Sequence, residues 1–99
     1  MSKIAINTSN APSAIGTYSQ AIVSGELVFI SGQIPFDPQN NAKVEGDRAA
    51  QINRTFQNLA NVAESSGSSL DNCLKLTIFL LDLKDFDIIN TIMKDFFSV

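Results

Sequence analysis

Two short β-prone runs joined by a glycine-containing connection limit most strongly how this chain can fold. Residues 20–23 and 27–30 flank Ser24-Gly25-Glu26, in which the glycine can adopt the positive φ that a tight hairpin needs. We therefore expect an antiparallel β-hairpin. Because residues 27–30 are apolar on both faces, the second strand is expected to lie inside a sheet that is covered on both sides.

Other segments show the periods of an N-terminal strand and a long helix. Ile4 and Ile6 alternate with small or polar neighbours, which is typical of a short strand with one buried face. From Asp47 onward the apolar residues recur at steps of three and four, so an amphipathic helix is expected, with Asp47 as its N-cap and Gly67 at its end. Its apolar stripe is Ala49, Ile52, Phe56, Leu59, Ala60 and Ala63.

The C-terminal third indicates one more strand and one more helix. Apolar residues alternate along residues 74–81, first with polar and then with apolar partners, so a long strand buried on both faces at its far end is expected. Asp85 is the expected N-cap of a second helix. Its stripe is Phe86, Ile89, Met93 and Phe96. These elements make an α+β plan in which both helices pack on one face of an antiparallel-rich sheet, and residues 1–99 are expected to form a single domain.

The composition excludes several classes of site. The 7 Lys+Arg and 10 Asp+Glu residues give a net charge of −3, which argues against nucleic acid as a partner. The chain has no histidine, so a Cys/His zinc site and a histidine-activated nucleophile are both excluded, and its one cysteine, Cys73, cannot form a disulfide within the chain. The first residues show neither a secretory signal nor a membrane span, so a cytoplasmic protein is expected.

Two glycine-containing motifs are expected to meet at one end of the sheet. Residues 16–20 precede the first hairpin strand and residues 31–35 follow the second, so the hairpin brings them together. Tyr18 offers a phenol, Ser31 a hydroxyl and Gly32 a backbone amide with no Cβ beside it, a set that suits a small polar anion. The alternative is that glycine turns and a serine at a strand end are purely structural, as in many β-rich domains.

Two further residues carry groups that can bind or react. Asn90 lies on the second predicted helix, away from Met93, and its amide is either solvated or directed at a ligand; spacing does not decide between the two. Cys73 is interpreted as a structural residue, because no histidine is present to activate its thiol.

Four segments, in the same order, resemble the RidA family, also called YjgF or the reactive intermediate deaminases. They are residues 10–12 (NAP), 14–21 (AIGTYSQA), 30–35 (ISGQIP) and 81–86 (LDLKDF). The resemblance covers nearly the whole chain. It implies a chorismate mutase-like α+β domain that assembles as a homotrimer, with ligand clefts at the subunit boundaries.

The same resemblance implies an activity and a site. Family members hydrolyse reactive enamines and imines, such as 2-iminobutanoate and 2-iminopropanoate, to 2-keto acids and ammonia, without a metal or other cofactor. By matching position, Tyr18, Ser31 and Gly32 would be catalytic, and these three residues with Asn90 would contact the 2-imino or 2-keto acid. Donors aimed at developing charge and a positioned water do most of the work in such a hydrolysis. Older labels for the family are translation inhibitor and endoribonuclease L-PSP.

The sequence differs from the family pattern in two places. Thr17 stands where proline is usual, which removes a restraint on the backbone before Tyr18. Family members also continue beyond the position of Phe97 with two strands that carry an arginine for the substrate carboxylate and a glutamate that orients water, so a sheet without these last two strands is expected. A non-catalytic trimeric module that binds small carboxylates is therefore the alternative to an imine deaminase. An endoribonuclease is favoured least, because the chain is acidic and lacks histidine.

Overall fold

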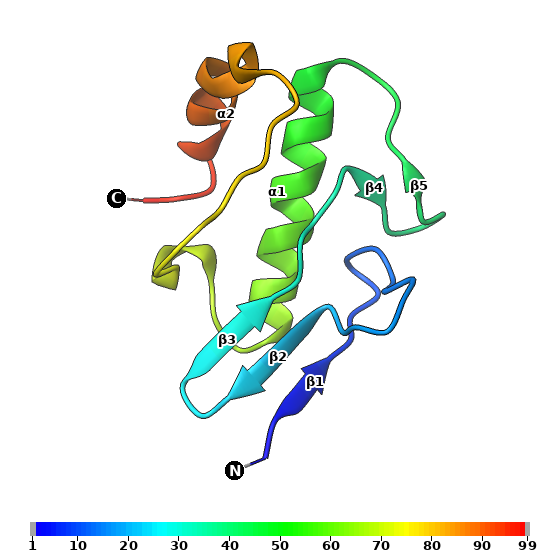
Figure 1. Ribbon diagram of the computed structural model, residues 1–99, viewed down its shortest axis with the longest axis vertical. Helices are drawn as coiled ribbons and strands as arrows, with labels where there is room; N and C mark the ends of the chain where they lie inside the picture. The colour runs from blue at the N-terminus through cyan, green and yellow to red at the C-terminus, as the bar shows by residue number, and fades with distance from the viewer. Residues whose placement is uncertain (1, 99) are drawn as a thin grey trace.

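The main sheet of the protein has three antiparallel strands. In the computed structural model, which describes residues 2–98, the strands β1 (Ile4–Ile6), β2 (Ala21–Ser24) and β3 (Leu27–Ile30) follow one another in the order β1-β2-β3 (Figure 1). Ile22 in the central strand pairs with Ala5 on one side and with Phe29 on the other. The N-terminal strand and the hairpin predicted from the sequence are both confirmed. The expected buried face of β1 is not, because Ile4 is exposed and only Ile6 is partly buried.

The hairpin turn is as tight as the sequence predicts. Ser24 pairs directly with Leu27, so only two residues lie between the strands. Gly25 has a φ of 59°, a left-handed conformation that costs a residue with a side chain roughly 1–2 kcal/mol. A second antiparallel ribbon, β4 (Phe36–Asp37) and β5 (Ala42–Lys43), follows β3 along the chain.

The helix α1 (Arg48–Ser65) begins and ends where the sequence predicts. The Asp47 side chain accepts a hydrogen bond of 2.9 Å from the Ala50 N–H, which satisfies one of the free N–H groups at the helix start. After the C-cap at Ser66, Gly67 has a φ of 84° and ends the helix. α1 lies against β3 and β4, so it covers one face of the strands (Figure 1).

One apolar cluster joins α1 to the sheet. Its buried members are Ala11, Ala21 and Val62, and Ile6 and Val28 pack against them. Val62 is fully buried although the predicted stripe omits it. The reason is that α1 contacts the sheet on one side and a second helix on another, so its buried surface is wider than a single stripe.

A second cluster joins α1 to α2 (Phe86–Met93). The ring of Phe56 stacks on Phe96 at a centroid distance of 5.5 Å and meets Phe97 edge-on at 5.9 Å. Ile89 is buried in α2 as expected, whereas Phe86 is exposed, contrary to the prediction. α2 packs mainly on α1, so only a narrow face of it is covered. The α+β fold class is confirmed.

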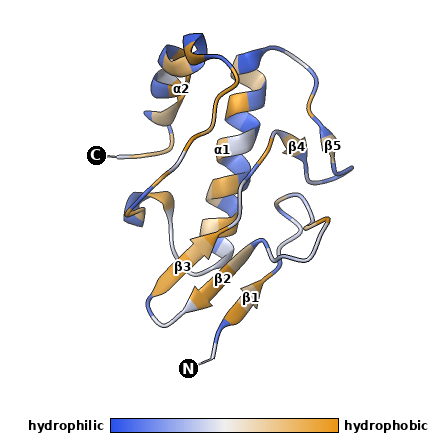
Figure 2. Ribbon diagram, viewed as in Figure 1, coloured by the Kyte–Doolittle hydropathy of each residue, from blue (hydrophilic) through white to orange (hydrophobic). Residues whose placement is uncertain are grey.

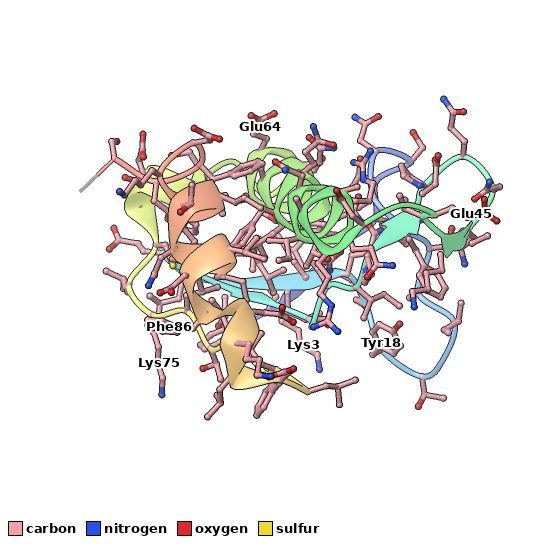
Figure 3. The ribbon with its side chains drawn as sticks, turned by 90° about the horizontal axis from the view of Figure 1, so that it is seen from above. Lys3, Tyr18, Glu45, Glu64, Lys75 and Phe86 are labelled. Atoms are coloured by element: carbon pink, nitrogen blue, oxygen red, sulfur yellow. The ribbon has the colours of Figure 1, made fainter. Side chains whose placement is uncertain are left out.

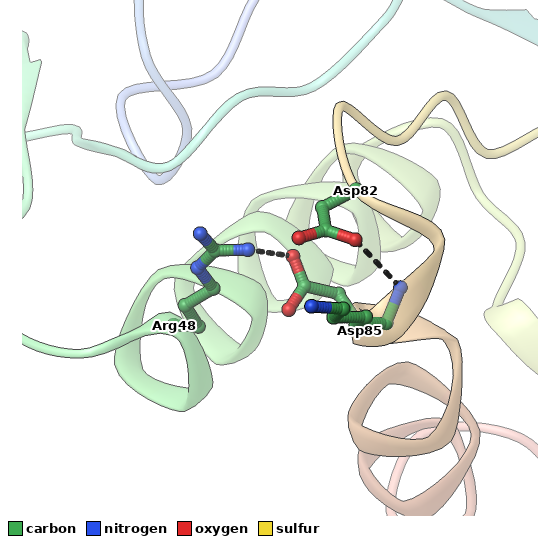
Figure 4. A network of polar contacts seen from close by, with 4 residues as sticks. Arg48, Asp82 and Asp85 are labelled. Carbon is green, nitrogen blue, oxygen red and sulfur yellow. Dashed lines mark hydrogen bonds and ion pairs between the residues drawn. The ribbon is translucent and has the colours of Figure 1, made fainter.

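The start of α2 differs from the prediction in its capping. The Asp85 side chain makes no capping hydrogen bond; its carboxylate instead forms an ion pair with Arg48 at the start of α1 (Figure 4). Asp82 caps the short 3-10 turn η2 (Leu83–Asp85) by accepting a hydrogen bond of 2.9 Å from the Lys84 N–H. The ion pair links the two helix starts, although its exposure limits it to about 0–1 kcal/mol.

The predicted strand over residues 74–81 is wrong. These residues follow the short 3-10 turn η1 (Leu70–Asn72) without regular secondary structure, and no strand within residues 2–98 pairs with them. Leu76 and Leu80 pack against the Phe56 cluster. Burial does not alternate either, because the other apolar side chains of the segment are all exposed: Leu74, Ile78, Phe79 and Leu81. A strand needs backbone hydrogen bonds from a neighbour, and an alternating pattern cannot supply them.

The prediction that the second hairpin strand is covered on both sides is also wrong. β3 is an edge strand of the three-stranded sheet. On one of its faces, Leu27 is 49% exposed and Phe29 is 61% exposed. Figure 2 shows how strongly apolar all three strands are. α1 packs against β3 from one side (Figure 1). No helix within residues 2–98 is long and apolar enough to span a bilayer.

Candidate functional site

The two glycine motifs meet where β2 begins and β3 ends. The Ser31 hydroxyl donates a hydrogen bond of 2.5 Å to the Ser19 carbonyl, and the Ser31 N–H donates to the Gln20 carbonyl at 3.0 Å. The strand register is consistent with this, because Ala21 pairs with Ile30. The expectation that the two motifs lie at the same end of the sheet is confirmed.

A recess of about 130 Å³ opens beside these motifs. Tyr18 and Gly32 line it, with Ile34 among the apolar lining residues. A Cβ built on Gly32 would meet nothing within 4 Å, so the backbone there borders open space. The Tyr18 hydroxyl accepts a long contact of 3.5 Å from the Ile15 N–H, and the ring is half exposed at the edge of the molecule (Figure 3).

The ring of Tyr18 explains the glycine two residues before it. A Cβ at Gly16 would lie 3.3 Å from the Cε2 atom of that ring, closer than most real contacts of a Cβ. Glycine therefore lets the ring lie against the backbone of its own loop. Thr17, which takes the place of the usual proline, is exposed between the two.

Ser31 and Asn90 are placed differently from Tyr18 and Gly32. Ser31 directly precedes Gly32, but its hydroxyl donates to the Ser19 carbonyl and it does not line the recess. Asn90 is exposed on α2, which lies on the other side of α1 from the loop of Tyr18 (Figure 1). Figure 3 likewise separates Tyr18 from Phe86 at the start of α2. One chain thus brings Tyr18, Ser31 and Gly32 together, and leaves Asn90 apart.

The recess is uncharged. None of its lining residues is an Asp, Glu, Lys or Arg, and Tyr18 is the one ionisable side chain among them. The Gln33 amide, also at the recess, donates a hydrogen bond of 3.1 Å to the Ser31 carbonyl. Hydrogen bonds from a phenol and a backbone N–H can hold a small polar molecule here, without a charged partner for a carboxylate.

A larger recess of about 220 Å³ lies at the far end of α1. Glu64, Asp71 and Asp95 line it. Hydrogen bonds from Ser98 hold the pKa of the Asp71 carboxyl below its ordinary value of 3.8, with the larger contribution from the Ser98 hydroxyl and the smaller one from its N–H. Because ionised carboxylates repel an anionic ligand, the smaller recess at Tyr18 is the better candidate for a carboxylate substrate.

Three amide side chains around the recess were missed by the sequence reasoning. They are Gln20, Asn41 and Asn58, and each one makes a hydrogen bond to the main chain of a segment that lines the recess. A signal existed for Asn58, because it is a polar residue on the buried side of an amphipathic helix. Gln20 belongs to the motif over residues 14–21, but only its three-dimensional partners reveal a role.

Comparison with known proteins identifies the family. The model of the Endoribonuclease L-PSP family matches residues 8–99. The 2-iminobutanoate/2-iminopropanoate deaminase of Salmonella typhimurium is 41% identical over 93 residues, which is 94% of this chain and 72% of that protein. The crystal structure of RidA from an Antarctic Psychrobacter has a TM-score of 0.90 at 40% identity, covering 96% of this chain and 76% of that one.

A further solved structure was determined with a small molecule in place. Escherichia coli TdcF with bound serine has a TM-score of 0.88 at 38% identity, and the similarity covers 94% of this chain and 72% of that one. Sequence identity of 38–41% over nearly all of the chain shows both the family and the fold. The chain therefore belongs to the RidA family, whose family model is described as Endoribonuclease L-PSP, and it has the family's α+β fold.

Proposed function

We propose that this chain hydrolyses reactive 2-imino acids, such as 2-iminopropanoate and 2-iminobutanoate, to 2-keto acids and ammonia without a cofactor. The observation that carries the proposal is a recess lined by Tyr18 and Gly32 in a chain that is 41% identical to a deaminase of this kind. In the reaction, water adds to the imine carbon, the C–N bond then breaks, and the nitrogen leaves as ammonia.

The proposed roles follow from the groups at the recess. Tyr18 can donate from its hydroxyl, and Gly32 can present its N–H without a side chain in the way, so both are assigned to the substrate and to the charge that develops on it. Ser31 does not line the recess but directly precedes Gly32. Its hydroxyl donates to the Ser19 carbonyl and still has two lone pairs, which we assign to accepting from water or substrate at the border of the recess.

We also propose a cytoplasmic homotrimer with ligand clefts at the subunit boundaries. Exposed apolar side chains support self-association, because contact with another copy would remove their surface from water. They include Leu27, Phe29, Phe79 and Leu81. Asn90 lies apart from the recess of its own chain, so its proposed contact with the ligand requires a neighbouring copy.

A non-catalytic module that binds small carboxylates is the second candidate. It is favoured by the uncharged recess, in which Tyr18 is the one ionisable lining group and no acid–base pair is formed. Such a module would bind a 2-keto acid such as pyruvate and leave the imine to hydrolyse at its rate in water.

Hydrolysis of 2-iminopropanoate, generated in place by an amino-acid oxidase, separates the two candidates. Tyr18→Phe removes one hydroxyl, and we expect it to lower the rate about a hundredfold to a thousandfold, as loss of one positioned donor does. Lys75→Ala is the control, because Lys75 is exposed and lies far from Tyr18 in Figure 3. A folded trimer that leaves the imine at its background rate contradicts the deaminase and favours the binding module.

A further inference from the structure

Only two polar side chains are buried within residues 2–98, and both are carboxamides. Gln20, directly before β2, is 3% exposed, and Asn58, in α1, is 0% exposed. Burying an amide costs free energy unless its polar atoms are hydrogen-bonded. The partners of these two amides therefore show which parts of the fold depend on them.

Gln20 holds the segment that precedes it. Its Oε1 accepts a hydrogen bond of 2.6 Å from the Thr8 N–H. Its Nε2 donates to the carbonyls of Thr8, Ala11 and Pro12 at 3.0, 3.3 and 2.8 Å. Both ends of the amide are thus engaged by the main chain of residues 8–12, and the amide is not free to bind a ligand, although Gln20 borders the recess.

Asn58 holds the segment that follows β3. Its Nδ2 donates to the carbonyls of Ile34 and Phe36 at 3.1 and 2.9 Å, and its Oδ1 accepts a hydrogen bond of 3.0 Å from the Nε of Arg54. The bond from Arg54 fixes which end of the amide faces the two carbonyls. The Ile34 carbonyl also accepts from the Phe36 N–H at 2.8 Å, and Phe36 is the first residue of β4. The Asn58 amide therefore fastens the start of β4 to α1.

The two held segments line the same recess. Pro12 belongs to the first, with Ser13 directly after it, and Ile34 and Phe36 belong to the second. Asn41, which has a positive φ of 54°, joins the two sides, because its Oδ1 accepts a hydrogen bond of 2.9 Å from the Ser13 N–H. The recess therefore lies between two segments, each fastened by one buried carboxamide.

We propose that Gln20 and Asn58 are positioning residues of the recess, which set the spacing of its lining segments and so its affinity for a small 2-imino or 2-keto acid. The identity of the ligand rests on the proposed function, whereas the effect of the two amides on the spacing of the lining segments does not. Both residues act through main-chain carbonyls and not by touching the ligand. An apolar side chain in either place would remove these hydrogen bonds, and the segment would lose the contact that fixes its position.

Kinetics of Gln20→Met and Asn58→Ser test the proposal. The matched control is Asn53→Ala, because the Asn53 amide donates to the Ala49 carbonyl within α1 and holds no segment of the recess. We expect KM for 2-iminopropanoate to rise about tenfold in each positioning variant and to stay within about twofold in the control. A purely structural role predicts a lower apparent kcat with unchanged KM, because unfolded molecules bind no substrate.

A second readout needs no ligand. Tyr18 is the one tyrosine of a chain without tryptophan, so intrinsic fluorescence reports on the recess alone. We expect acrylamide to quench this fluorescence more strongly in Gln20→Met and Asn58→Ser than in the parent, and equally in Asn53→Ala and the parent. If the parent hydrolyses no imine, the proposed function fails, and the quenching still decides the role of the two amides.

Folded positioning variants whose KM and quenching both match the parent would overturn the inference. Should Asn58→Ser fail to fold, Arg54→Met takes its place, because it keeps the side-chain stem and removes the donor to the Oδ1 of Asn58. It is expected to raise KM and the quenching in the same direction by a smaller factor. Arg54→Met with an unchanged KM and unchanged quenching would overturn the role of Asn58.

Discussion

The loops around the recess and the segment over residues 73–82 are both irregular, but only the loops are held by buried polar side chains. Around the recess, Gln20 and Asn58 bond to main-chain carbonyls and fix the path of the backbone. In the second region, Phe79 and Leu81 are almost fully exposed. Polar side chains can hold irregular backbone from within one chain, whereas apolar side chains do so only when another surface covers them.

Loss of the Phe56 ring is expected to have the largest effect on stability. Phe56 is 5% exposed and packs on Phe96 and Phe97, so it joins α1 to the end of the chain that follows α2. Leu76, from the segment over residues 73–82, packs against the same cluster. Phe56→Ala should lower the free energy of unfolding by about 3–5 kcal/mol. Urea denaturation measures this change. A loss below about 1 kcal/mol, the size of an ordinary substitution, would show that α2 is held by other contacts.

The N-cap of α1 tests how much a hydrogen bond between near neighbours in the sequence contributes to stability. Asp47→Ala removes the hydrogen bond to the Ala50 N–H and should cost about 1 kcal/mol. Thermal unfolding followed by circular dichroism checks the value. Asp47→Asn serves as the control, since its amide oxygen can still accept the bond, and it should recover most of the loss; equal losses in both variants would contradict a capping role.

Phe79→Ala is the exposed counterpart of Phe56→Ala. Phe79 is 93% exposed, so at low protein concentration the free energy of unfolding should change by no more than about 0.5 kcal/mol. At higher concentration the variant should associate less than the parent, which sedimentation velocity measures. If the dilute protein loses as much stability as Phe56→Ala does, the segment is packed within the single chain and the contrast between the regions fails.

The smallest expected effect is a pH dependence near the C-terminal end. Because the hydrogen bonds from Ser98 lower the folded-state pKa of Asp71, the contact stabilises the protein above the ordinary value of 3.8 and is lost as the pH falls through the lowered pKa. The amide shift of Ser98 should follow that titration, and Asp71→Asn should abolish it. A Ser98 titration at or above the ordinary carboxyl pKa would contradict this assignment.

The elements that the sequence predicts correctly depend on local chemistry. Gly25 in the hairpin turn and Asp47 at the start of α1 act on neighbours within a few residues, so a short stretch of sequence is enough to predict the turn and the helix start. The meeting of Tyr18 with Gly32 follows from the same hairpin. These parts need no knowledge of distant segments.

The parts that the sequence does not predict depend on distant partners. Residues 74–81 have the alternation of a strand, but within residues 2–98 no neighbouring backbone pairs with them. Asn58 donates to carbonyls more than twenty positions away, at Ile34 and Phe36, and no short sequence pattern predicts such a hydrogen bond. Asp85 likewise has the sequence position of a helix cap, and its ion pair with Arg48 depends on how the two helices pack.

Mapping of pyruvate binding by amide chemical shifts tests most directly whether the recess at Tyr18 is the ligand site. Pyruvate is the product expected from 2-iminopropanoate, and each amide signal reports its own residue. Signals of Tyr18 and Gly32 should shift in a saturable manner, while those of Glu64 and Asp95 at the larger recess stay in place. Shifts confined to Glu64 and Asp95, or none at any concentration, would contradict the assignment of the site.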